Sequence, residues 1–264
     1  MNIVKPFVVL YRHRKVLIST TMVDIKTKFA GSLLGMFWLL LYPILLLTAY
    51  SFVYIFIFQV RFGTMNTPTY VMLIFAGLIP FLGFTEGLAS SIVSVTANSA
   101  LLKNTMYPVD IIPAKAVFTS QCTQVVGQII LIIALLIGGR LTIYSFLVIP
   151  IWIFQIMFSI GLGWIVSCLN VYVKDLQNIV NLITLFLMMV SPIAYTVDMV
   201  PQGLRAFLAW NPLYYFITAY QDCLVVGCFP RENVLIILAI FSVLIFIIGY
   251  WFFIKMKTIF SDNI

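Results

Sequence analysis

Residues 129–137 read IILIIALLI, and the longer stretch 116–138 that contains them reads AVFTSQCTQVVGQIILIIALLIG. The unbroken apolar run lacks the alternation of apolar and polar residues that a transmembrane β-strand requires. The longer stretch has the roughly 20 predominantly apolar residues that an α-helix needs to cross a bilayer core. Because lipid offers no partner to unpaired backbone groups, a helix is the required conformation. The stretch 116–138 therefore predicts a transmembrane α-helix.

The composition extends this interpretation to the whole chain. Of the 264 residues, 63% are hydrophobic and 9% are charged, whereas a soluble domain carries about 25% charged residues. Soluble enzymes, disordered chains and fibrous proteins are excluded on this ground. The sequence predicts an all-α polytopic membrane protein that forms a single transmembrane domain over 1–264. Its six transmembrane helices are expected at 33–58, 70–93, 116–138, 146–170, 178–197 and 234–254.

The basic residues predict the orientation. Six spans place both termini on one side, and the side with the termini holds eleven of the fifteen Lys and Arg residues, including those of the tail 255–264. Basic residues collect in cytoplasmic loops, so both termini are expected in the cytoplasm. Basic residues in cytoplasmic loops also explain the net charge of +7. Nucleic-acid binding is not indicated, because the sequence contains no soluble basic domain to carry it. The first apolar run, 6–10, is too short for a cleavable signal peptide.

The N-terminal segment 1–32 predicts a helix that lies in the membrane interface. Its apolar residues recur at three-, four- and seven-residue steps, and basic residues occupy much of the remaining surface. A soluble amphipathic helix docked on a partner remains an alternative. The apolar face consists of Phe7, Tyr11, Ile18, Met22, Ile25 and Phe29.

The segment 198–233 between the last two spans is too apolar for a hydrated loop. It is also too interrupted for a seventh span, because Pro201, Gly203, Pro212 and Gly227 punctuate it. Two short re-entrant helices fit best, and irregular backbone at membrane depth is tolerated beside a water-filled cavity. The alternative is a belt of aromatic anchors at the interface. The candidate residues for a pathway here are Trp210, Tyr214, Tyr215 and Phe207, with Tyr195 just before the segment.

The sequence contains no catalytic constellation, no metal-ligand spacing and no phosphate-binding loop of the Gly-x-x-x-x-Gly-Lys-Ser/Thr type. Cys223 and Cys228 can meet as a disulfide if their segment faces an oxidising compartment, and the alternative is that both stay free. Glu86 is the one carboxylate inside an expected span, which makes it a candidate for a functional site. Gln121 and Gln124 share a helix face and either join helices across the bundle or face a hydrated lumen.

The second connection on the side of the termini, 97–113, predicts a docking element. Two adjacent leucines lie between polar residues in it, and two prolines, Pro108 and Pro113, follow before the third span. We expect a short exposed helix that contacts another protein in the cytoplasm. Its candidate contact residues are Asn98, Leu101, Leu102, Lys103 and Asn104.

Several stretches together resemble the permease subunits of ABC exporters for lipid-linked polysaccharides, the O-antigen, capsule and teichoic acid group. The family opens with a basic-Tyr/Phe-x-x-Ser-x-Leu-Gly-x-x-Trp stretch, and residues 28–38 here read KFAGSLLGMFW, followed by Pro43. Residues 103–113 resemble the segment after the family's coupling helix, and 172–175, YVKD, resemble an aromatic-x-Arg-Asp motif. Lys174 replaces the usual Arg and loses its bidentate fork. The late landmarks are Ser191-Pro192 and Asn211-Pro212-Leu213.

The resemblance implies a transporter permease and not an enzyme. It implies a homodimer whose two copies enclose a channel, two copies of a separate ATPase that binds ATP and Mg²⁺, and no cofactor on this chain. The substrate it implies is an undecaprenyl-type lipid-linked glycan, O-antigen or capsule, exported across the bacterial inner membrane. Residues 98–104 with Lys174 and Asp175 would contact the ATPase, and the aromatic residues of 204–220 would form the outer gate. The alternatives are a permease of the same fold for wall teichoic acid, a drug, a peptide or another lipid, and an integral membrane enzyme or ion-coupled carrier.

Overall fold

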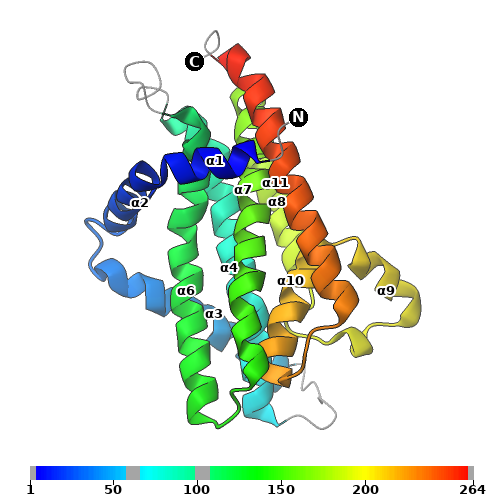
Figure 1. The fold of residues 1–264 in the computed structure, drawn as a ribbon. Coiled ribbons are helices and arrows are strands. Elements are labelled where there is room, and N and C mark those ends of the chain that lie inside the picture. Colours follow the sequence, from blue (N-terminus) through cyan, green and yellow to red (C-terminus); the bar gives the residue numbers. More distant parts are fainter. Residues whose placement is uncertain (1–3, 58–65, 99–107, 261–264) are drawn as a thin grey trace.

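The computed structural model describes residues 4–57, 66–98 and 108–260, and every regular element within these ranges is a helix (Figure 1). Five of the described helical stretches are long and apolar enough to cross a membrane: Gly35–Ile57, Thr67–Ala97, Val109–Ile137, Ile143–Tyr172 and Asn233–Lys257. They match the first four expected spans and the last. The chain is therefore a multi-pass α-helical membrane protein by length and composition.

The described elements follow one another in a fixed order. They are α1 (Lys5–Arg12), α2 (Arg14–Lys28), η1 (Gly35–Phe37), α3 (Trp38–Ser51), η2 (Phe52–Ile57), α4 (Thr67–Ala97), η3 (Val109–Ile111), α6 (Ile112–Ile137), η4 (Ile143–Leu147), α7 (Val148–Tyr172), α8 (Leu176–Val190), η5 (Val197–Met199), α9 (Gln202–Ala209), α10 (Pro212–Gln221), η6 (Asp222–Val226) and α11 (Glu232–Phe260).

Helix α4 forms the centre of the bundle. It packs against α6, α7, α10, α8 and α3, and 78% of its most apolar 18-residue stretch is buried inside the protein. Helices α7 and α11 pack side by side through Gly161 and Gly249. A Cβ atom on Gly249 would lie 2.1 Å from the carbonyl oxygen of Gly161. Small residues at this crossing let the two backbones approach closely, as is common between membrane helices.

The fifth expected span is wrong at its end. Helix α8 stops at Val190 and has 15 residues, which corresponds to about 22 Å at 1.5 Å per residue. Ser191 adopts an extended conformation with φ −75° and ψ 142°, and Pro192 follows it. The residue before a proline disfavours the α conformation. Residues 191–197, expected to be helical, therefore form an irregular corner that includes Tyr195, and η5 begins at its end.

The N-terminal segment contains two helices, where the sequence predicted one. The break lies at His13, whose φ of −98° and ψ of 13° are not helical. Leu17 is buried against α6, whereas Phe7, Tyr11 and Met22 are exposed. Much of the expected apolar face is thus exposed in the described part of the chain, although the Phe7 ring packs against Phe246 of α11 at 4.9 Å. Such a face suits lipid.

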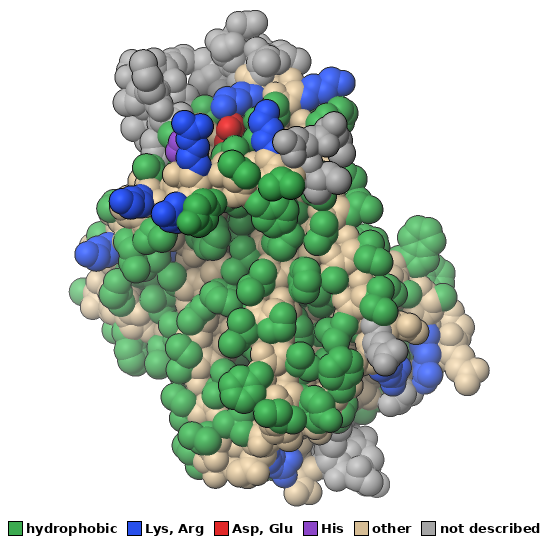
Figure 2. Space-filling model, viewed as in Figure 1, with side chains coloured by type: hydrophobic (Ala, Val, Ile, Leu, Met, Phe, Trp, Pro, Cys, Tyr) green, Lys and Arg blue, Asp and Glu red, His purple; other side chains and the backbone are tan. Residues whose placement is uncertain are grey.

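Charge separates the two ends of the molecule. Figure 1 places both termini at one end of the bundle. Figure 2 shows that Lys and Arg side chains gather near this end and along the N-terminal helices, whereas the visible middle of the bundle is covered mainly by apolar side chains. This banding is typical of a membrane protein whose apolar middle contacts lipid.

Candidate functional site

Two of the landmark motifs meet in space. Asn211 begins α10 and its Oδ1 accepts a hydrogen bond from the Leu213 backbone N–H at 3.0 Å, which caps the helix. Its Nδ2 donates to the Ser191 Oγ at 2.9 Å. The exposed fractions of Asn211 and Ser191 are 6% and 1%. This buried contact fixes the start of α10 against the end of α8.

Further hydrogen bonds hold the corner after α8. The Tyr70 hydroxyl on α4 donates to the Ala194 carbonyl at 2.5 Å. The Gln221 Nε2, at the end of α10, lies within hydrogen-bond distance of the carbonyls of Leu73, Pro192 and Ile193 at 3.0 to 3.3 Å. Side chains from α4 and α10 therefore bind the backbone of the same corner. Helix α10 is therefore attached to the bundle core by polar contacts at both of its ends.

The expected gate residues lie on the helix pair α9–α10 with one exception. Helix α9 stands out from the side of the bundle (Figure 1), and Phe207 and Trp210 are 70% and 88% exposed. The rings of Tyr214 and Tyr215 contact each other edge to face at 5.0 Å, and the Tyr215 hydroxyl donates to the Ala209 carbonyl. Tyr195 instead lies in the corner after α8, where its hydroxyl donates to the Val190 carbonyl.

A buried polar cluster joins α10 to three other helices. Gln124 Nε2 donates to Gln155 Oε1 at 2.8 Å, and the Tyr220 hydroxyl donates to the same oxygen at 2.9 Å. Gln155 Nε2 donates to the Pro80 carbonyl of α4 at 2.8 Å. All three side chains are almost fully buried. Gln124 therefore lies inside the bundle and not on a lumen. Gln155 was missed, although a lone glutamine in an apolar span was a visible signal, and Tyr220, the last residue of the expected gate segment 204–220, lies buried in this cluster.

Gln121 also lies inside the bundle. Its Oε1 accepts a hydrogen bond from the Trp152 indole N–H at 2.8 Å, and its side chain is 3% exposed. The lumen role that we considered for Gln121 and Gln124 does not fit these positions. Both amides join helices, which is the common use of such side chains in membranes.

Glu86 has a partner that hydropathy alone does not reveal. Its carboxylate forms an ion pair with Lys28 at the end of α2. The pair lines a cavity of about 590 Å³ that is bounded by α3, α4, α6 and α8. Ser32 and Trp38 from the landmark stretch 28–38 also line it, and the Trp38 indole donates to the Ser32 hydroxyl at 3.1 Å. The N-terminal landmark therefore folds beside the one acidic residue of α4.

Two more ion pairs connect the elements at the end that holds the termini. Lys115 on α6 pairs with Asp24 on α2 at 2.8 Å, and Lys257 on α11 pairs with Asp110 in η3 at 2.7 Å. The Trp164 indole also donates to the Asp110 backbone carbonyl at 2.8 Å. These contacts fix the segment that follows 99–107 to three neighbouring helices.

The expected docking residues are divided between described and undescribed parts of the chain. Leu101, Leu102, Lys103 and Asn104 lie outside the described residues. Asn98 is half-buried at the end of α4, and its Nδ2 donates to the Ser94 carbonyl at 2.7 Å. Lys174 and Asp175 are exposed in the short turn between α7 and α8. This turn lies at the same end of the bundle as the termini (Figure 1).

Cys223 and Cys228 are both free thiols in the structure. Cys223 is buried in η6, and burial raises the pKa of its thiol to about 12. Cys228 is exposed. The open possibility of a disulfide between them is not realised here.

The long apolar helices, the hydrogen bonds at both ends of α10 and the landmark stretch beside Glu86 together form a polytopic bundle of membrane helices. Residues 16–225 match the family described as ABC-2 type transporter. Because this match covers most of the chain, the protein belongs to the ABC-2 type transporter family, which confirms the resemblance at the level of the family.

Relatives with assigned functions align over most of both chains. The chain is 27% identical over 248 residues to the O-antigen export system permease protein RfbA of Klebsiella pneumoniae, covering 93% of each chain. It is 28% identical over 240 residues to the protein of the same name from Myxococcus xanthus, covering 89% of this chain and 90% of the relative. It is 25% identical over 229 residues to the polysialic acid transport protein KpsM of Escherichia coli, covering 86% and 87%.

Proposed function

We propose that this chain is the transmembrane subunit of an ATP-driven exporter that moves a lipid-linked polysaccharide, O-antigen or capsule, across the bacterial inner membrane. The observation that carries the proposal is the near full-length similarity to permeases named for O-antigen export and polysialic acid transport. Membership of the ABC-2 transporter family supports it. The names of these relatives favour a glycan over a drug or another lipid.

A channel between two copies is supported by the uncovered surfaces of α3 and α8. In the first span only 6% of the most apolar 18-residue stretch is buried within the chain. Helix α8 exposes Leu182, Phe186 and Met189. The cavity beside Glu86 and a second cavity of about 690 Å³ both lie between these two helices. A second copy facing α3 and α8 would enclose both cavities in one path.

Six crossings and cytoplasmic termini belong to the same proposal. With α8 and the corner 191–197 as a short fifth crossing, the number of crossings is even and the termini share one side. The gathering of basic side chains near the termini supports a cytoplasmic position for that end. The helix pair α9–α10 would then be the re-entrant segment at the outer end of the path, with Trp210, Tyr214 and Tyr215 near the exit.

The motor would be a separate ATPase that carries ATP and Mg²⁺. The sequence holds no phosphate-binding loop, and residues 98–104 with Lys174 and Asp175 of each permease copy would contact one of two ATPase copies. Replacing Leu101 and Leu102 with Asp would place charges in this contact, and an uncompensated buried charge typically costs about 3–5 kcal/mol. Copurification of the ATPase should then fall sharply. Ile143→Asp, at the opposite end of the bundle, should leave it unchanged. Undiminished copurification with the double variant would refute the docking assignment.

Deletion of the coding sequence tests the function itself. The deletion strain should lose its surface polysaccharide and accumulate lipid-linked polymer inside the cell, and the wild-type chain should restore export. Surface polymer is measured on intact cells, and total polymer is measured after lysis. If surface and internal polymer were unchanged by the deletion, the proposed function would be wrong.

A further inference from the structure

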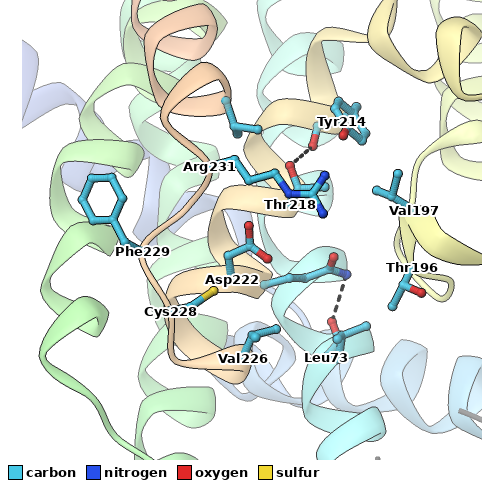
Figure 3. A pocket seen from close by; sticks show the side chains of 12 residues that line it. Leu73, Thr196, Val197, Tyr214, Thr218, Asp222, Val226, Cys228, Phe229 and Arg231 are labelled. Atoms are coloured by element: carbon cyan, nitrogen blue, oxygen red, sulfur yellow. Dashed lines mark hydrogen bonds between the residues drawn. The ribbon is translucent and has the colours of Figure 1, made fainter. Parts of the chain in front are cut away.

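Another polar cavity lies beside α10, away from the Lys28–Glu86 pair. Its volume is about 290 Å³, and its walls come from α10, from η6 with residues 228–231, from residues 196–197, from Leu73 of α4 and from the start of α11 (Figure 3). This volume is at the small end of ligand pockets, which span roughly 300–1,000 Å³. The cavity therefore suits a single ring or a group of similar size.

Two opposite charges face this cavity without closing on each other. Figure 3 shows that the Asp222 carboxylate and the Arg231 guanidinium both turn into the space beside α10. Neither forms an ion pair with the other or with another residue in the described ranges. Burial raises the pKa of the Asp222 carboxyl, and the nearby Arg231 opposes that shift. Both groups therefore keep hydrogen-bonding capacity for a ligand.

The remaining walls add acceptors and an aromatic side chain. The Thr218 hydroxyl donates to the Tyr214 carbonyl at 2.7 Å, so its oxygen keeps free acceptor capacity. The Gln221 amide nitrogen is used by the corner after α8, and its carbonyl oxygen is left as an acceptor. Tyr214 supplies a ring, and Val197 and Val234 supply apolar contacts. Donors, acceptors and apolar patches thus alternate around the space.

This combination selects against simple ions. Arg231 repels a metal cation and Asp222 repels an anion, so neither single charge matches the walls. A neutral ring with several adjacent hydroxyls matches both groups, because each hydroxyl donates to the carboxylate and accepts from the guanidinium. Such a ligand would also satisfy the Asp222 carboxylate, which is half-buried and whose solvation is therefore incomplete.

We propose that the cavity lined by Asp222, Arg231, Thr218 and Tyr214 binds one sugar ring of the exported polymer at the outer end of its path. The proposal rests on the proposed function, since it takes the exported chain as the source of the sugar. Through Tyr214, the site adjoins the aromatic residues of α9–α10. It would hold one ring of the polymer while the next rings pass the exposed aromatics.

A native cysteine offers a direct readout. Cys228 lines the cavity and is exposed, whereas Cys168 and Cys223 are buried and Cys122 is half-buried. A chain in which Cys122, Cys168 and Cys223 are replaced by Ala keeps Cys228 as its single thiol. A membrane-impermeant maleimide then reports access to the cavity on intact cells. Labelling is compared between cells that make the polymer and cells in which the first glycosyltransferase of its synthesis is disabled.

We expect Cys228 to label severalfold more slowly in the cells that make the polymer. Asp222→Asn and Arg231→Gln should each abolish this difference, while Arg140→Gln, which removes an arginine outside the cavity, should preserve it. Equal labelling of the unsubstituted cavity with and without polymer would overturn the proposal. Equal labelling is also the result expected if another molecule, such as a lipid headgroup, filled the cavity in both kinds of cell. Protection that survives both cavity substitutions would also overturn it.

The same cells separate this test from the proposed function. Surface polymer is measured in each strain beside the labelling. If the single-cysteine chain restores export to the deletion strain and Cys228 is nevertheless not protected, the sugar site is wrong and the export function stands. If the deletion strain keeps its surface polymer, the export function is wrong whatever the labelling shows.

Discussion

Replacing Asn211 with Ala should destabilise the protein more than any exposed polar substitution. The change removes the cap of α10, which typically costs about 0.5–2 kcal/mol. It also leaves the buried Ser191 hydroxyl without its donor, and an unsatisfied buried group costs about 1–3 kcal/mol. Because both contacts are nearly sealed from solvent, we expect a loss of about 2–4 kcal/mol in the free energy of unfolding.

The assay is denaturant or thermal unfolding of the purified protein in detergent, with Ser191→Ala and the double variant measured beside it. Ser191→Ala alone should cost about 1–3 kcal/mol, because it leaves the buried Asn211 Nδ2 without its acceptor, and the double variant should cost less than the sum of the two single changes. Asn178→Ala, an exposed asparagine on α8, is the matched control and should change little. Strict additivity, or an Asn211→Ala variant as stable as the wild type, would refute the reasoning about this contact.

Two further predictions concern the bundle. Lys28→Glu or Glu86→Lys alone should lower surface polymer, because each places like charges beside the cavity of about 590 Å³. The exchange of both residues should restore much of the export, and an exchange no better than either single variant would contradict a pairwise contact. Gly249→Ala should lower the free energy of unfolding by about 1–3 kcal/mol, because its Cβ would lie 2.1 Å from the Gly161 carbonyl oxygen. Gly203→Ala, with open space around it, should be neutral in the same unfolding assay, and equal stability of the two variants would argue against close backbone packing.

Hydropathy predicted the spans that cross the bundle from end to end, because a helix that crosses the bilayer core must be predominantly apolar over about 20 residues. It failed at the end of α8, where Ser191 and Pro192 stop the helix inside an apolar run. Local backbone geometry prevailed there over hydrophobicity. Hydropathy also treated the N-terminal segment as separate from the bundle, and so it gave no indication that Lys28 pairs with Glu86.

The site was predictable in its parts but not in its contacts. Ser191 and Asn211 were both identified as landmarks, yet their contact depends on how α9 returns the chain to the end of α8. Gln155 and Tyr220 complete the cluster around Gln124 from helices far away in the sequence. Such pairings are set by tertiary packing, and no spacing within one helix encodes them. Asp222 and Arg231 likewise become one site only when η6 turns the chain back towards α11.

The central claim is that glycan leaves through a path closed at its outer end by the α9–α10 pairs of two copies. The most direct measurement is ATP-driven uptake of lipid-linked polysaccharide into inside-out membrane vesicles. The chain carries Cys228→Ser and Tyr214→Cys, so that each of the two copies presents one introduced cysteine at position 214. A disulfide between the two introduced cysteines should stop uptake while the ATPase stays bound, and reduction should restore it. Uptake that continues at the uncrosslinked rate with the disulfide fully formed would contradict the account.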